Sequence, residues 1–134
     1  MLRFLKKQSA FSLVEIMVVC FLLSVLMAIA IPAYLSARLD ADKQKALYNL
    51  FAIYQAQKLY YFEQNPRDYA NDITSLSPDY ATLSDDDGAW AYSVAGGGGS
   101  FVATASHKLP DGTLDGHWLS IDQTGALDET GWPY

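Results

Sequence analysis

The residue with the clearest potential for chemistry is Glu15, a lone carboxylate inside an apolar run. The run covers residues 11–35, and its uninterrupted middle, 16–31, has Ser24 as its only hydroxyl. A carboxylate in or near hydrocarbon costs several kcal/mol unless it is neutralised or paired. Because carboxylates in such positions are usually functional, we expect Glu15 to have a partner; the alternative is that it only marks a membrane boundary.

The other residues of chemical interest show no pattern that predicts catalysis. Cys20, the single cysteine, lies in the apolar run, where a thiol behaves as a small hydrophobic group. His107 and His117 are isolated in the sequence, so neither a catalytic nor a metal-binding role is expected. Glycines 96–99 lack the Lys-Ser/Thr of a phosphate-binding loop and instead indicate a hairpin connection. We therefore predict that the chain is not an enzyme.

Charge is distributed unevenly along the 134 residues, whose net charge is −6. The first ten residues carry +3, from Arg3, Lys6 and Lys7, and the remaining residues carry −9. A basic start followed by an apolar run is typical of a membrane-inserted segment whose positive end stays in the cytoplasm. The run is also long enough for a bilayer core, which needs about 20 helical residues. The acidic remainder argues against nucleic-acid binding.

Two interpretations of this N-terminus are open. In the first, it is a secretory signal peptide with a small-x-small cleavage site at Ala28-Ile29-Ala30. Signal peptidase would then release a soluble binding domain that begins at Ile31. This interpretation leaves Glu15 unexplained, and the apolar region is longer than the usual length of about 7–15 residues.

The second interpretation depends on the string Lys6-Lys7-Gln8-Ser9-Ala10-Phe11-Ser12-Leu13-Val14-Glu15. It resembles the cleavage and methylation motif of type IV pilin-like proteins. The resemblance implies that a prepilin peptidase removes residues 1–10 as a leader, cutting between Ala10 and Phe11, and that Phe11 is then N-methylated. Glu15 becomes fifth in the mature chain, as in the family, and Pro32 twenty-second, where a proline is common. Ala10 departs from the family pattern, which nearly always has Gly before the cut.

The resemblance also implies how the chain assembles, with residues 11–35 forming a transmembrane and later a filament-core helix. In a filament, the amine of Phe11 can meet Glu15 of a neighbouring subunit. Such a pair stabilises strongly only in the right geometry, so it fixes the axial register. Pro32 has no N–H and clashes with the carbonyl of Ala28, which weakens the helix. The resemblance implies that the segment 24–32 can become extended in the filament; a mild kink is the alternative.

After Pro32, the sequence favours an α+β architecture. Apolar residues at spacings of three and four predict an amphipathic continuation of the helix over residues 36–65, ending before Pro66. We expect the aromatic residues of 48–62 to pack mostly against a sheet. Alternating apolar residues predict three strands, near 90–94, 101–105 and 117–122. Residues 66–134 should therefore form a loop and an antiparallel β-sheet head.

Two features of the head follow from the resemblance. Tyr69 and Leu76 resemble the residues by which the family anchors the loop after the helix. Most type IVa pilins close the C-terminal region with a disulfide, which a chain with one cysteine cannot form. Packing of aromatic residues, or a bound ion, must then stabilise this region; the aromatic residues are Trp118, Trp132 and Tyr134.

Calcium is the ion that major pseudopilins use in this region. Two sets of candidate ligands are present: Asp122, Asp128 and Glu129, or Asp85, Asp86 and Asp87. Neither set has the spacing of a calcium loop, so solvated acidic turns are expected and no cofactor is predicted.

The sequence thus predicts a structural subunit of a type IV pilus or a related pilin-like filament. The implied partners are similar subunits, the prepilin peptidase, an assembly platform protein and its ATPase. The precursor would be a single-pass protein of the bacterial inner membrane, and the mature chain would lie in a cell-surface filament. The alternatives are a pseudopilin in the periplasmic pseudopilus of a type II secretion system, or the secreted soluble domain described above.

Overall fold

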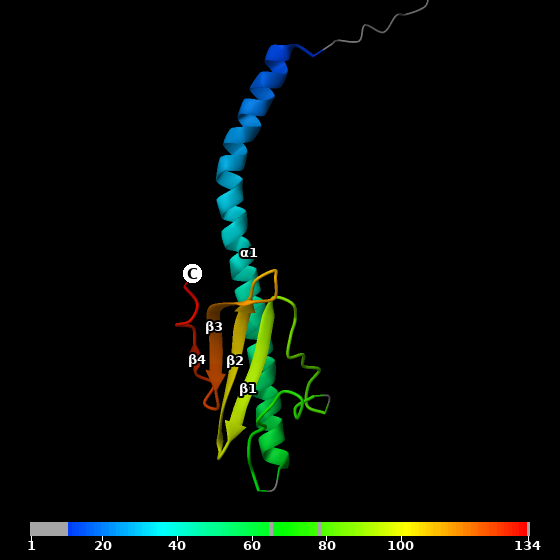
Figure 1. Ribbon diagram of the computed structural model, residues 1–134, viewed down its shortest axis with the longest axis vertical. Helices are drawn as coiled ribbons and strands as arrows, with labels where there is room; N and C mark the ends of the chain where they lie inside the picture. Colours follow the sequence, from blue (N-terminus) through cyan, green and yellow to red (C-terminus); the bar gives the residue numbers. More distant parts are fainter. Residues whose placement is uncertain (1–10, 65, 78, 134) are drawn as a thin grey trace, which may run out of the picture. The chain divides into compact units, whose positions relative to one another are not determined.

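The computed structural model describes residues 11–64, 66–77 and 79–133. The chain forms two units that divide in sequence between Arg38 and Leu39, and each is described by itself. One helix contributes residues to both units, and the strands belong to the second (Figure 1). The elements are α1 (Leu13–Glu63), β1 (Trp90–Gly97), β2 (Ser100–Lys108), β3 (Leu114–Asp122) and β4 (Leu127–Asp128). This is the predicted α+β fold.

The first unit consists of the apolar part of α1. Every residue described in it, 11–38, is exposed to its surroundings. Pro32 lies inside the helix without ending it. Two serine hydroxyls bond back to the preceding turn, Ser24 to the carbonyl of Phe21 and Ser36 to that of Ala33. A helix that is apolar on all sides needs an apolar environment, which this unit does not supply itself.

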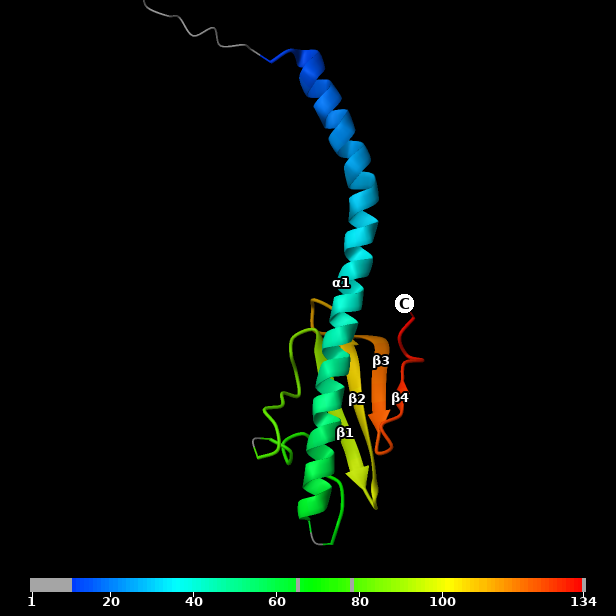
Figure 2. The ribbon, with the colours of Figure 1, turned by 180° about the vertical axis from the view of Figure 1, so that it is seen from behind.

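In the second unit, residues 39–63 of α1 pack against one face of the sheet, as two opposite views show (Figures 1 and 2). The strand order is β1-β2-β3-β4 and all pairs are antiparallel. The helix buries Ala46, Leu50, Ile53 and Gln57, which recur at spacings of three and four. These positions form one stripe, as expected of an amphipathic helix.

The buried face of the sheet follows the predicted alternation. Trp90, Tyr92 and Val94 of β1 are buried, and so are alternate residues of β2 and β3. The residues that β2 and β3 contribute to this core are Phe101, Ala103, Ala105, Leu119 and Ile121. The two-residue strand β4 was not predicted, because its length leaves no period to detect.

The predicted glycine hairpin joins β1 to β2. Gly97 pairs with Ser100, so the turn itself is Gly98-Gly99, with φ angles of 65° and 85°. Two positive φ angles are typical of the type I′ turn that suits twisted hairpins, and glycine adopts them without steric cost. Gly96 is needed for another reason: a Cβ there would lie 2.2 Å from the Ala70 carbonyl oxygen.

The expectation that the aromatic residues of 48–62 mostly pack against the sheet is wrong for three of them. Tyr48 is 76% exposed, Phe51 47% and Phe62 65%. At 100° per residue these positions lie opposite the buried stripe, so the helix turns them away from the sheet. With Leu59, which is also exposed, they form an apolar stripe on the outer side of the helix. We call these four residues the outer stripe.

Candidate functional site

The N-terminal end of α1 carries the residues that the sequence singled out. Phe11 precedes the helix and is 73% exposed, while Glu15 lies exposed in the first turn. A carboxylate in the first turn is favoured by the helix dipole. Ala10 and the leader lie outside the described residues. Phe11 and Glu15 are therefore both open to contact at the same end of α1.

The apolar surface of the first unit extends well beyond this end. Large apolar side chains from Leu13 to Leu35 are exposed around the whole helix. Exposed apolar patches larger than a few hundred Å² mark interaction or membrane surfaces. Among the described residues, α1 is the one helix long and apolar enough to cross a membrane. It stays helical from Ser24 to Pro32, so the extended form remains a prediction for an assembled state.

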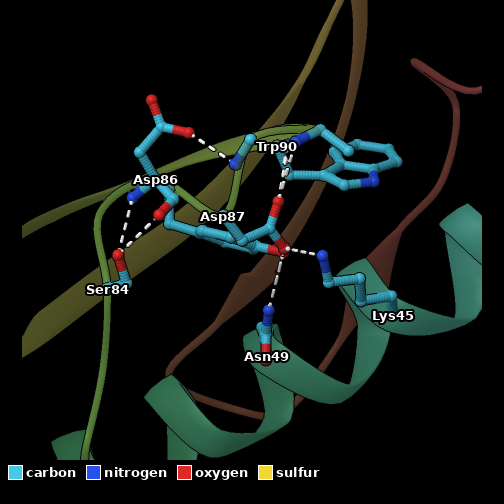
Figure 3. A network of polar contacts seen from close by, with 9 residues as sticks. Lys45, Asn49, Ser84, Asp86, Asp87 and Trp90 are labelled. Carbon is cyan, nitrogen blue, oxygen red and sulfur yellow. Dashed lines mark hydrogen bonds and ion pairs between the residues drawn. The ribbon is translucent and has the colours of Figure 1, made fainter.

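In the head, Asp87 ties the segment before β1 to the helix (Figure 3). Its carboxylate accepts hydrogen bonds from the Trp90 N–H at 2.8 Å and the Tyr92 hydroxyl at 2.8 Å. From α1, Asn49 donates to it at 3.3 Å, and Lys45 forms an ion pair at 3.1 Å. A single carboxylate therefore holds together α1, the loop and β1.

The loop after the helix is anchored by the two predicted residues. Leu76 is fully buried. The Tyr69 ring stacks on Tyr61, with 4.6 Å between centroids, and packs on Phe101 at 4.9 Å. Tyr69 and Leu76 thus join the loop to both the helix and the sheet.

In the calcium candidate set at residues 85–87, two of the three carboxylates are engaged in other contacts. In Figure 3 the carboxylates of Asp86 and Asp87 point in different directions. Asp86 accepts from the Gly88 N–H and pairs with Lys108, and hydrogen bonding with Lys108 is the main cause of its lowered pKa. Asp87 belongs to the network with α1.

The other candidate set, made of Asp122, Asp128 and Glu129, is also divided among separate contacts. Asp122 caps its own turn by accepting from the hydroxyl and the N–H of Thr124, and the hydroxyl bond is the main cause of its lowered pKa. Asp128 accepts the Thr130 N–H, and Glu129 pairs with Lys43 of α1 at 2.7 Å. The structure does not bring either carboxylate set together around one point.

The two histidines, by contrast, both contact Asp115, so residues that are isolated in the sequence lie close together in the fold. The Nδ1 atoms of His107 and His117 lie 2.5 Å and 2.9 Å from Oδ2 of Asp115. These three residues form the one group of three or more potential metal ligands in the described part of the chain. The Asp-Gly-His spacing of 115–117 is the only signal in the sequence, and it has meaning only once the register of β2 and β3 is known.

The C-terminal segment is closed by aromatic packing, as predicted for Trp118 and Trp132. Trp132 is buried, and its ring lies 5.3 Å from that of Trp90. The Gly131 carbonyl accepts the Trp118 N–H at 3.2 Å. Tyr134 lies outside the described residues. The segment is thus held against the sheet without a covalent bond.

The comparisons with known proteins agree with this picture. A family model described as the prokaryotic N-terminal methylation motif matches residues 5–31, which contain the predicted cleavage motif. The type IV major pilin protein PilA of Myxococcus xanthus (strain DK1622) is 36% identical over 72 residues, 53% of this chain and 33% of the relative. The type II secretion system core protein G of Aeromonas hydrophila is 33% identical over 60 residues, 45% of this chain and 42% of the relative.

The chain therefore spans about a third to two fifths of the length of these curated relatives. No solved structure matches it significantly. The methylation motif and the two relatives make the chain similar to type IV pilin-like proteins, and the apolar N-terminal helix and the four-stranded head agree with that likeness. This is the similarity that the cleavage motif predicted.

Proposed function

We propose that the chain is a structural, non-catalytic subunit of a type IV pilus. It is made as a precursor in the bacterial inner membrane, cut between Ala10 and Phe11, and N-methylated at Phe11. The observation that carries this proposal is the apolar part of α1, whose side chains are exposed on all sides. The membrane covers this surface in the precursor, and neighbouring subunits cover it in the filament.

Assembly into a filament follows from the symmetry of such contacts. When each subunit contacts the next through two different surfaces and the rotation does not close, an open helical filament results. The Phe11 amine of one subunit and Glu15 of a neighbour form the pair that fixes the register. The exposed positions of Phe11 and Glu15 support this arrangement.

The partners that this function requires are similar pilin subunits, the prepilin peptidase, and an assembly platform protein with its ATPase. The mature filament lies on the cell surface. The match of the methylation motif to residues 5–31, which include most of the apolar run, supports this set of partners.

A second candidate function is that of a pseudopilin in a type II secretion system. The match to a type II secretion core protein G favours it, and so does the single cysteine, which excludes the C-terminal disulfide of most type IVa pilins. The abundance of the subunit distinguishes the two functions. A major pilin is the main protein of sheared surface filaments, whereas a pseudopilin stays with the envelope fraction.

Processing is tested by the intact mass and N-terminal sequence of the chain expressed in a host with prepilin peptidase. The expected mature chain begins at N-methylated Phe11. A chain that begins at Ile31 would contradict the proposal and support release by signal peptidase. The Ala10→Gly variant, which restores the family's usual residue, is the matched control and should be cut at the same bond.

A further inference from the structure

An irregularity in the pairing of β2 and β3 places the two histidines beside Asp115. Ser106 pairs with Trp118 and Lys108 with Leu114, so His107 alone faces three residues of β3, 115–117. The middle one is Gly116, whose φ of +86° suits a β-bulge. The bulge turns the side chains of Asp115 and His117 toward His107.

The Asp115 carboxylate is held in place by the backbone. Its Oδ1 accepts the His117 N–H at 2.9 Å, which leaves Oδ2 facing both imidazoles. One potential ligand atom from each of the three residues lies within 4.8 Å of the other two. An ion ligated at about 2.0–2.2 Å in tetrahedral geometry needs ligand atoms about 3.3 Å apart. Shifts of about 1 Å therefore suffice to place the three atoms around one ion.

Aromatic rings enclose this cluster on its inner side. The His107 ring lies 4.9 Å from Trp90 and 5.5 Å from Trp132, and the His117 ring lies 5.8 Å from Trp132. The side chains of His107 and Asp115 are mostly buried, whereas that of His117 is 31% exposed. Burial between indoles reduces competition from water, and the exposed edge of His117 gives an ion access.

We propose that His107, Asp115 and His117 bind a first-row divalent transition-metal ion, with Zn²⁺ as the physiological candidate. Two imidazoles and one carboxylate suit Zn²⁺, Cu²⁺ or Ni²⁺, whereas Ca²⁺ and Mg²⁺ prefer oxygen ligands only. A positive charge close to the site would oppose a cation, and Lys108 follows His107 in β2. The ammonium of Lys108, however, pairs with Asp86. Water completes the coordination.

The ion would replace the covalent closure that a single-cysteine chain lacks. It connects β2 to β3, and through the Trp132 ring it fixes the C-terminal segment on the sheet. A metal ion that binds the folded chain and not the unfolded chain stabilises the fold by mass action. The melting temperature should therefore rise with the concentration of free metal. This proposal does not depend on the function of the filament.

The test uses the full chain in detergent micelles, without a polyhistidine tag and after removal of metals by a chelator. Calorimetric titration with ZnCl₂ should give one ion per chain. Asp115→Asn and His107→Gln should each weaken binding by about tenfold or more, because each removes one of three protein ligands. Asp111→Asn is the matched control, since Asp111 caps the neighbouring turn through Thr113 and should leave binding unchanged.

A second measurement needs no variant. The chain has two histidines, so NMR of its imidazoles gives two sets of signals, and Zn²⁺ should shift both at one equivalent. Circular dichroism of each variant with chelator verifies that the head is folded. The proposal is overturned if Zn²⁺ shifts neither imidazole or only one. It is also overturned if all variants bind as the wild type does, or if Ca²⁺ raises the melting temperature and Zn²⁺ does not.

Discussion

The side chain of Gln57 makes both backbone hydrogen bonds of Ala70. Its Nε2 donates to the Ala70 carbonyl at 2.8 Å, and its Oε1 accepts the Ala70 N–H at 2.9 Å. Gln57 is completely buried, and Ala70 nearly so. A helix residue thus gives an irregular loop the hydrogen bonds that a neighbouring strand would give, because a buried backbone group without a partner is costly.

Gln57→Ala should therefore lower the free energy of unfolding of the head by about 2–4 kcal/mol, since it leaves a buried N–H and a buried carbonyl unpaired. The measurement is a denaturant titration of the full chain in detergent, followed by near-ultraviolet circular dichroism. Gln55→Ala is the matched control: the same change at an exposed position of α1 should shift stability by less than about 0.5 kcal/mol. Equal effects of the two variants would contradict the role of Gln57.

Gly131 packs directly on Trp118. A Cβ at Gly131 would lie 2.5 Å from Cδ2 of the indole and 2.6 Å from the Trp118 carbonyl oxygen. Gly131→Ala should therefore push the C-terminal segment off the sheet and destabilise the head by about 1–3 kcal/mol. Limited proteolysis should show faster cleavage of this segment. Thr130→Ala, at an exposed neighbouring position, should keep the cleavage rate of the wild type.

The features that the sequence predicts correctly are those with a regular period or a distinctive local string of residues. The apolar run defines the first half of α1, and alternation from Trp90 to Val94 defines β1. The glycine run predicts the hairpin because glycine readily adopts the two positive φ angles that a type I′ turn requires. The cleavage motif predicts the likeness to the family because its residues occur at fixed offsets, and the match to residues 5–31 agrees.

The features that escaped prediction depend on register and on three-dimensional packing. Leu50 and Phe51 both fit the helical spacing of three and four residues, so the sequence does not distinguish them. Only packing on the sheet determines that Leu50 is buried and Phe51 is exposed. His107 and Asp115 are brought together by a bulge that has no signature in β2 itself. The role of Asp87 likewise requires knowing that the segment before β1 returns to α1.

The outer stripe should act in assembly and not in folding. Phe51→Ser removes an exposed ring, so the stability of the head should change by less than about 0.5 kcal/mol. If a neighbouring subunit covers this ring, the loss of about 1.5–3 kcal/mol of apolar burial should reduce filament yield by about tenfold or more. Sheared filaments and thermal melts measure the two effects.

Leu50→Ser is the comparison for that variant, because Leu50 is fully buried one position earlier in α1. It should lower the stability of the head itself by several kcal/mol. A normal filament yield from Phe51→Ser would show that the outer stripe faces solvent in the filament.

Glu15→Gln tests the register of the filament. It keeps the size of the side chain and removes its charge, so insertion into the membrane should be normal. The amine of a neighbouring Phe11 then loses its partner. Because every 1.4 kcal/mol weakens an association about tenfold, and breaking a buried pair costs more than this, filaments should be absent or disordered. Asp40→Asn, an exposed carboxylate elsewhere on α1, should assemble normally; normal filaments from Glu15→Gln would exclude the register role.

Acid should weaken the contact between α1 and the segment before β1. Burial raises the pKa of Asp87, but the hydrogen bonds from Tyr92 and Trp90 and the contact with Lys45 outweigh it, so the net pKa lies below the usual value. Burial, together with the bond to Asp87, raises the pKa of Tyr92, which therefore stays protonated and donating. Since the folded-state pKa of Asp87 is depressed, its contribution to stability is complete above the unfolded-state value of about 3.9.

This contribution is lost as the pH falls through the folded-state pKa of Asp87. Denaturant titrations at a series of pH values from about 6 to 3 should therefore show a steep loss of stability in the wild type. Asp87→Asn should be less stable at pH 6, because Lys45 loses its ionic partner, and should lose less on acidification. Asp85→Asn removes the same charge from an exposed side chain two positions away and should retain the wild-type slope. If Asp87→Asn were as acid-sensitive as the wild type, the lost stability would have to come from other carboxylates, such as those that cap the turns at Asp111 and Asp122.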